Sequence, residues 1–89
     1  MCQGSYESAF VRWANENKID FDWQIPHKMP NGKTYWVDAY IKSGNYKNNW
    51  LEIKGYFRKD AEEKWNWFHS ENVNSIIWFK KDLKEIGIL

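Results

Sequence analysis

The hydrophobic positions in the first half of the chain follow a period of two in two neighbouring stretches. Residues 19–25 read IDFDWQI, so an apolar residue occupies every odd position. Residues 33–41 read KTYWVDAYI, and the odd positions after the first are again apolar. Strict alternation of this kind predicts two strands, each with one buried face. An Asn-Gly turn signal between them predicts a hairpin, and we expect Pro26 and Pro30 to end the first strand.

Two further stretches follow the 3.6-residue period of a helix. Residues 6–17, with Ser5 as the predicted cap, place one set of residues on a common face: Glu7, Phe10, Val11 and Ala14. A capping-box pattern that starts at Asp60 opens a second predicted helix, which runs to about Ser70. Its predicted inner face consists of Ala61, Lys64, Trp65 and Phe68.

Two more stretches complete the predicted sheet. Residues 49–55 read NWLEIKG, in which Leu51 and Ile53 share one face. Residues 75–79 read SIIWF, and such a short, continuously apolar run predicts a strand in the interior of a sheet. The tail that follows is expected to add a helical turn. The predicted order is α-β-β-β-α-β, an α/β fold with a mixed four-stranded sheet flanked by helices. A right-handed crossover would pair the last two strands in parallel.

The length and the aromatic content add a size and an assembly to this picture. The 89 residues predict a single domain over residues 1–89 with a modest core. Hydrophobic residues make up 43% of the chain, which is too apolar for a disordered segment. Seven tryptophans are more than a small core hides, so we expect some rings at an interface or in solvent, where they can stack on unpaired bases. We therefore expect a homodimer.

The charge distribution limits where a polyanionic partner can bind. The net charge of +1 gives no global basic field, so a nucleic-acid surface has to be local. Basic residues gather in two predicted loops, Lys42 with Lys47 and Arg58 with Lys59. Solvated loop charge is the alternative interpretation of both pairs.

Cysteine and histidine give no sign of zinc or of nucleophilic chemistry. Cys2 has no partner for an internal disulfide, and no Cys/His set has zinc-site spacing. His27 and His69 are expected to be a loop residue and a helix-end residue, since neither lies near a nucleophile pattern. No apolar signal region or membrane-spanning run is present, so we expect a soluble cytoplasmic protein that does not bind a membrane.

Three acidic residues stand out by their positions. Asp38 lies mid-strand between apolar neighbours, and Glu7 faces inward from the first predicted helix. Glu52 lies on the next strand, with Lys54 on the same face. If the two strands are neighbours, these side chains converge, and clustered carboxylates repel unless a cation such as Mg²⁺ or Mn²⁺ neutralises them. The alternatives are a surface ion pair on an edge strand and, for Glu7, a favourable place at a helix N-terminus.

This set of residues resembles the PD-(D/E)XK nuclease superfamily. The resemblance is carried by Asp38 in YWVDAYI, by Glu52-Ile53-Lys54 in WLEIKG, and by Glu7 in YESAFVRW. The glycine directly after the motif lysine and the small size look like phage endonuclease-I junction resolvases and very-short-patch-like or homing nucleases. Val37 stands where the family usually has a proline. The predicted element order matches that family's restriction-endonuclease-like core, and the similarity to phage enzymes is consistent with a phage-encoded protein in a bacterial host.

The resemblance implies Mg²⁺-dependent hydrolysis of DNA phosphodiester bonds, with Mn²⁺ as a substitute. Asp38, Glu52 and the Ile53 carbonyl would be metal ligands, and Glu7 would bind a second metal or a metal-bound water. Lys54 would position the attacking water or the scissile phosphate. A further set of basic residues is expected to contact DNA: Lys42, Lys47, Arg58, Lys59 and Lys64.

Two alternatives stay open at this point. One is a catalytically silent nucleic-acid- or protein-binding module on the same fold, and the other is cleavage of RNA. Lys64 has an alternative of its own, because a lysine on an inner helix face can extend its charged end to solvent. Both branched and linear substrates are compatible with the sequence.

Overall fold

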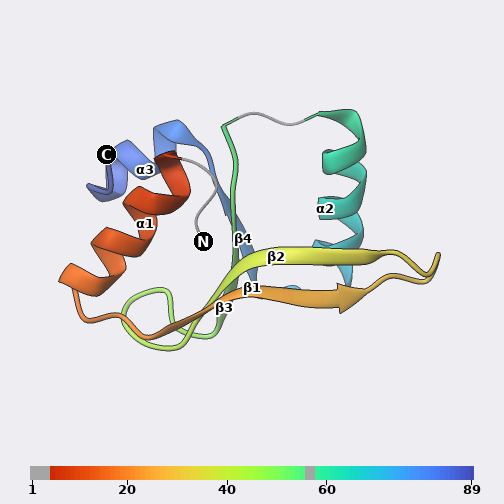
Figure 1. The fold of residues 1–89 in the computed structure, drawn as a ribbon, viewed down its shortest axis with the longest axis horizontal. Coiled ribbons are helices and arrows are strands. Elements are labelled where there is room, and N and C mark those ends of the chain that lie inside the picture. The colour runs from red at the N-terminus through yellow and green to blue at the C-terminus, as the bar shows by residue number, and fades with distance from the viewer. Residues whose placement is uncertain (1–4, 56–57) are drawn as a thin grey trace.

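The helices and strands follow one another in the predicted order, with one helix added at the end (Figure 1). The computed structural model describes residues 5–55 and 58–89, so Cys2 lies outside the described residues. The elements are α1 (Ser5–Glu16), β1 (Phe21–Lys28), β2 (Thr34–Ile41), β3 (Asn49–Ile53), α2 (Lys59–Glu71), β4 (Ser75–Trp78) and α3 (Lys80–Ile86). The predicted α/β class is therefore confirmed. Within the described ranges, no helix has both the length and the apolar character to cross a membrane.

The sheet is mixed and has the strand order β1-β2-β3-β4. β1 pairs antiparallel with β2, and β2 pairs antiparallel with β3. β3 and β4 pair in parallel through α2, as predicted. β4 forms an edge of the sheet, so its predicted interior position is wrong. Its sequence is continuously apolar because both of its faces are covered: Ile76 and Trp78 pack on one side and Ile77 packs on the other.

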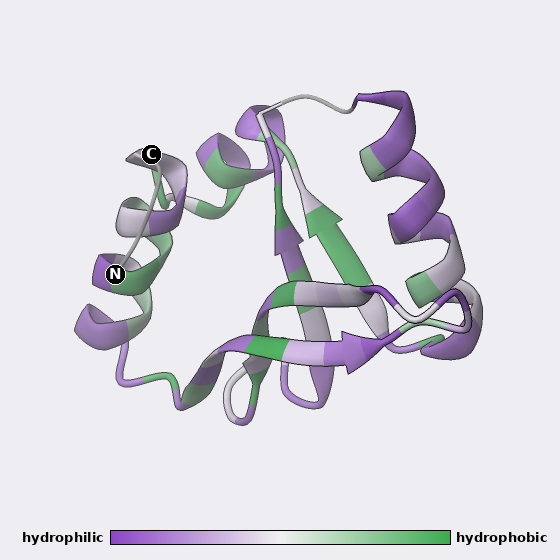
Figure 2. Cartoon of the chain, turned by 45° about the vertical axis from the view of Figure 1, so that its right-hand side comes forward, coloured by the Kyte–Doolittle hydropathy of each residue, from purple (hydrophilic) through white to green (hydrophobic). Residues whose placement is uncertain are grey.

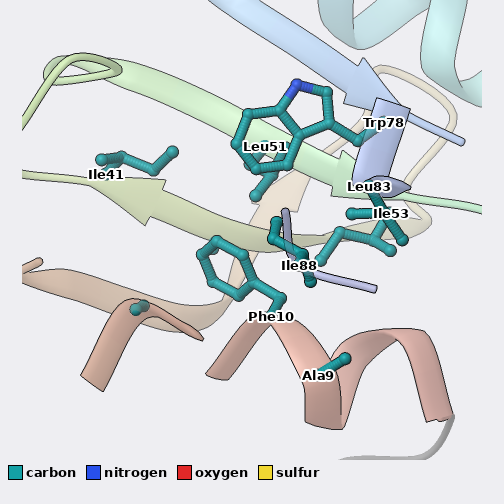
Figure 3. Packing of buried hydrophobic residues seen from close by; sticks show 10 residues of the cluster. Ala9, Phe10, Ile41, Leu51, Ile53, Trp78, Leu83 and Ile88 are labelled. Atoms are coloured by element: carbon teal, nitrogen blue, oxygen red, sulfur yellow. The ribbon is translucent and has the colours of Figure 1, made fainter. Parts of the chain in front are cut away.

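Two hydrophobic cores lie on opposite sides of β3 and β4. The α1-side core consists of Ala9, Phe10, Ala14, Ala39, Ile41, Leu51, Ile53, Trp78, Leu83 and Ile88 (Figure 3). The α2-side core consists of Tyr35, Val37, Trp65 and Phe68. Figure 1 shows α1 and α3 on one side of β3 and β4, with α2 on the other. Alternate residues of β2 supply both cores, which explains why the predicted period of two holds along its whole length.

The β1–β2 hairpin continues past the point where the sequence predicts its end. β1 runs to Lys28, and Pro26 pairs with Trp36 inside the ladder. The prediction that Pro26 ends the strand is wrong because β1 is an edge strand, and edge strands tolerate a missing N–H group. His27 is therefore a strand residue rather than a loop residue. Its ring packs edge-on against Trp50 and Phe68, with centroid separations of 4.7 and 4.9 Å.

Three details of the helices also differ from prediction. Ser5 is the first residue of α1 rather than its cap. α2 begins at Lys59 after Arg58, without a side-chain cap, so the predicted capping box at Asp60 is wrong. Lys64 is exposed rather than part of the inner face. Figure 2 shows that α2 is hydrophilic over most of its length, and the buried residues of α2 are Trp65 and Phe68.

The expected position of His69 is confirmed. His69 lies in the last turn of α2.

Replacing Phe10 by alanine should remove the centre of the α1-side core. Phe10 is fully buried, and its ring contacts four other rings at centroid separations between 5.3 and 6.2 Å. We expect Phe10→Ala to lower the free energy of unfolding by about 3–5 kcal/mol, because a large buried side chain leaves a cavity. Urea denaturation followed by tryptophan fluorescence measures this. Val73→Ala is the control, since Val73 is 79% exposed. If Phe10→Ala lowered the free energy of unfolding as little as the control does, Phe10 would not be the centre of the core.

Candidate active site

The candidate site lies where β2 and β3 diverge. In the described part of the chain, the β2–β3 pairing covers residues 39–41 and 49–51 and stops there. β2 nevertheless stays paired with β1 back to Thr34, and β3 stays paired with β4 forward to Ile53. Residues 34–38 of β2 and residues 52–53 of β3 therefore form the two arms of a fork in the sheet. Side chains, rather than a backbone ladder, occupy the space between the arms.

Asp38 links the two arms at the base of the fork. Its Oδ2 atom accepts a hydrogen bond from the backbone N–H of Ile53 at 2.7 Å. This bond satisfies an amide group that would otherwise lose a partner where the ladder ends. Asp38 is partly buried rather than fully enclosed. Gln24 of β1 has a φ of +53° and lies between the residues that pair with Ala39 and Val37, so the edge strand is distorted beside Asp38.

Glu52 is the most unusual group in the fork. Its side chain is 2% exposed, and its Oε2 atom accepts a hydrogen bond from the Tyr35 hydroxyl. Burial, followed by the hydrogen bond and charge of Asp38, raises the pKa of Glu52 to about 9, although Tyr35 and the positive charge of Lys54 act in the opposite direction. Glu52 is therefore protonated at neutral pH. The Asp38 carboxyl group next to it disfavours a second negative charge, which a divalent cation could offset.

Tyr35 is a neutral donor to this carboxyl group. Burial first, and then the charge of Glu52 and the hydrogen bond to it, raise the pKa of the Tyr35 hydroxyl well above its usual range. Sequence patterning places Tyr35 only on the apolar face of its strand, so its role in the site is missed. The available signal is chemical, because a buried phenol usually needs a hydrogen-bond partner.

A pocket of about 240 Å³ opens beside the fork. It is lined by Thr34, Tyr35 and Trp36 of β2, by Glu52 and Lys54, and by Asp60, Ala61 and Lys64 of α2. The N–H of Lys54 donates to the carbonyl of Trp78 at 3.0 Å, so this lysine continues the β3–β4 ladder. Glu52 and Lys54 therefore reach the same pocket from one strand face, as the alternation predicts.

Glu7 lies in the first turn of α1, which packs near the end of β3. A Cβ atom added at Gly55 would lie 3.4 Å from the Tyr6 ring, so the start of α1 is next to the segment that follows Lys54. However, no three Asp, Glu, His or Cys side chains in residues 5–55 and 58–89 are placed to hold a metal ion together. The structure brings Asp38, Glu52 and Lys54 together, and the convergence of Glu7 on the two acids stays a prediction.

The basic residues fall into two groups. Lys42 and Lys47 lie in the loop before β3. This loop joins the start of β3, whereas Lys54 follows its end, roughly 16 Å further along the strand. Lys42 is also 3.4 Å from Asp22 in an exposed ion pair. By contrast, Lys64 of α2 lines the pocket, and Arg58 and Lys59 directly precede Asp60, which also lines it. The structure therefore places only the second group next to the candidate site.

Comparison with known proteins adds no relative. No protein-family model, curated protein or solved structure matches the chain. The assignment of the site consequently depends on the fork geometry and on the chemistry of its side chains.

The protonated Glu52 should make the protein less stable as the pH rises. The pKa of this carboxyl group is higher in the folded protein than in the unfolded chain. Its contribution to stability is complete at pH values below the ordinary pKa of 4.5, and it is lost as the pH rises towards about 9. We expect the free energy of unfolding to fall by at most about 1.4 kcal/mol per pH unit in this window. Urea titrations in EDTA at several pH values measure the slope.

The matched variants for this test are Glu52→Gln and Glu62→Gln. Glutamine at position 52 does not ionise, so Glu52→Gln should flatten the slope, whereas Glu62 is exposed and its replacement should leave the slope unchanged. Both variants retain His27, whose pKa is lowered by burial, so its opposite contribution cancels in the comparison. Equal slopes in both variants would show that Glu52 ionises normally in the folded protein.

Proposed function

We propose that the chain is a Mg²⁺-dependent endodeoxyribonuclease that hydrolyses phosphodiester bonds in DNA. The observation that carries the proposal is the fork, where Asp38 and a buried Glu52 lie together and Lys54 enters the same pocket. Two carboxyl groups placed together form a set of oxygen ligands suited to a hard divalent cation. A lysine in the same pocket suits a phosphate substrate.

The chain's residues divide the proposed reaction between them. A bound Mg²⁺ would polarise the phosphate and lower the pKa of a water molecule. Asp38 and Glu52 would hold the ion through carboxylate oxygens, with the Ile53 carbonyl beside them, once Glu52 has released its proton. Lys54 would hold a phosphate oxygen or orient the water as negative charge develops. Hydrolysis forms one P–O bond from water and breaks one in the backbone, and the leaving oxygen takes up a proton.

Glu7 has a supporting role in this proposal. The first turn of α1 lies next to the segment after Lys54, so Glu7 would act on a second cation or on a water bound to the first. The absence of a three-acid cluster in the described residues favours a second candidate, a catalytically silent nucleic-acid-binding module on the same fold. Cleavage assays separate these candidates, with linear duplex, single-stranded and four-way-junction DNA and single-stranded RNA, each in Mg²⁺, Mn²⁺ or EDTA.

Asp38→Asn should weaken cation binding while keeping the fork intact. The asparagine carbonyl can still accept the Ile53 N–H bond, but the negative charge is lost. We expect calorimetric titration with Mn²⁺ to show one oxygen-ligand site in the wild type and at least about tenfold weaker binding in the variant. Asp20→Asn is the control, because Asp20 is exposed and far from the fork in the sheet. Equal Mn²⁺ affinity in wild type and Asp38→Asn would remove Asp38 from the ligand set.

Lys54→Ala should reduce turnover much more than it reduces DNA affinity. A group that acts on developing charge contributes mainly in the transition state, so we expect kcat to fall roughly 10²–10³-fold while Kd changes little. Lys81→Ala is the matched control, since Lys81 is an exposed lysine of α3. If turnover is normal in Lys54→Ala, Lys54 has only a structural role.

The proposed assembly is a two-fold dimer, which would place one site on each strand of a duplex. The tryptophan content gives this dimer little support, because Trp36 is the one tryptophan among the exposed large hydrophobic residues of the described chain. The support comes instead from the two-fold symmetry of duplex DNA. Light scattering at micromolar concentration should give twice the 10.8 kDa mass of one chain, with or without DNA. A monomer mass under both conditions would replace the dimer with a nicking enzyme.

A further inference from the structure

Trp36 is exposed in a chain that buries or half-buries its other tryptophans. Its side chain is 58% exposed, although it lies in the paired part of β2, opposite Pro26. The indole is not needed by either hydrophobic core, since the core face of β2 is formed by the alternate residues Tyr35 and Val37. The fold therefore gives no packing reason for an indole at this position.

The location of Trp36 connects it to the candidate active site. Trp36 lines the same pocket as Glu52, Lys54 and Lys64. It directly follows Tyr35, whose hydroxyl group donates to Glu52. Because Trp36 belongs to a hydrogen-bonded strand, its backbone position relative to the acids is fixed before any ligand arrives. On the β3 side, this part of β2 has no partner strand among the described residues, so a ligand can approach along the open arm of the fork.

We infer that Trp36 is a stacking platform for an unpaired nucleobase next to the scissile phosphate. This inference rests on the proposed function and narrows its substrate to nucleic acid with an unpaired nucleotide, such as a single strand, a flap or a gap. An indole ring stacks on the face of any base, and Lys64 supplies positive charge for a phosphate in the same pocket. Inside an intact duplex both faces of a base are already stacked, so the platform has nothing to bind.

The test measures binding in EDTA, where no cleavage occurs. The probes are oligonucleotides that carry 2-aminopurine in a single strand, in a one-nucleotide gap and in an intact duplex. We expect Trp36→Ala to bind the single strand and the gap about tenfold more weakly and the duplex equally well. Trp36→Phe should recover most of the affinity and the quenching of 2-aminopurine, because a smaller aromatic ring still stacks.

Two control variants separate stacking from charge and from general surface effects. Lys64→Ala should weaken binding to all three probes alike and reduce the salt dependence, as the loss of a phosphate contact does. Val73→Ala should change nothing, since Val73 is exposed but lies at the opposite end of the sheet from the fork. Circular dichroism checks that Trp36→Ala is folded.

Several results would overturn the inference. One is equal affinity of Trp36→Ala and wild type for the unpaired probes, and another is an equal loss of affinity for all three probes. A third is a dimer that dissociates in Trp36→Ala, which would make Trp36 a subunit contact. Cleavage in Mg²⁺ with the same proteins separates this inference from the proposed function. If Trp36→Ala cuts with unchanged substrate preference, the nuclease stands and the platform fails. If base stacking is present and no protein cleaves, the platform stands and the nuclease fails.

Discussion

The hydrogen bond from the Ile53 N–H to the Asp38 carboxylate determines where β2 and β3 part. The bond gives a partner to an amide group that has no ladder partner on β2, and an unsatisfied buried amide would cost about 1–3 kcal/mol. If the ladder continued, backbone bonds would fill the space where Glu52 now meets Tyr35 and Asp38. The pocket, the buried carboxyl group and the position of Lys54 all depend on this divergence.

The element order could be predicted from the sequence because it follows from local periodicity. The period of two persists along β2, and Val37 and Ala39 are both buried. For that reason, nothing in the pattern marks Asp38 as the residue where β2 loses its partner. The loss of pairing coincides with the bond between Asp38 and Ile53, which are 15 positions apart in the chain, so it is a tertiary effect. Pro26 fails as a stop signal for a related reason, because its effect depends on whether the strand is at an edge.

The candidate site was partly predictable from single residues. Asp38 and Glu52 attract attention because carboxyl groups are rare inside strands, and the structure places them together. Glu7 fits the helical pattern equally well, but its distance from the acids is set by how α1 packs on the sheet. Tyr35 is hidden in the sequence because ordinary alternation explains it, whereas Trp36 departs from the alternation but could equally have been an interface residue. Only the fork reveals that neighbouring residues on opposite strand faces border one pocket.

The two edges of the sheet determine how the chain behaves when it is concentrated. An exposed edge strand can recruit a strand from another molecule and start ordered aggregation. At one edge, β1 carries Pro26, which has no N–H to offer, and it is distorted at Gln24. At the other edge, β4 has only four residues. Neither edge is a long, regular template, so a chain this rich in aromatic residues is protected from growing into fibrils through its own sheet.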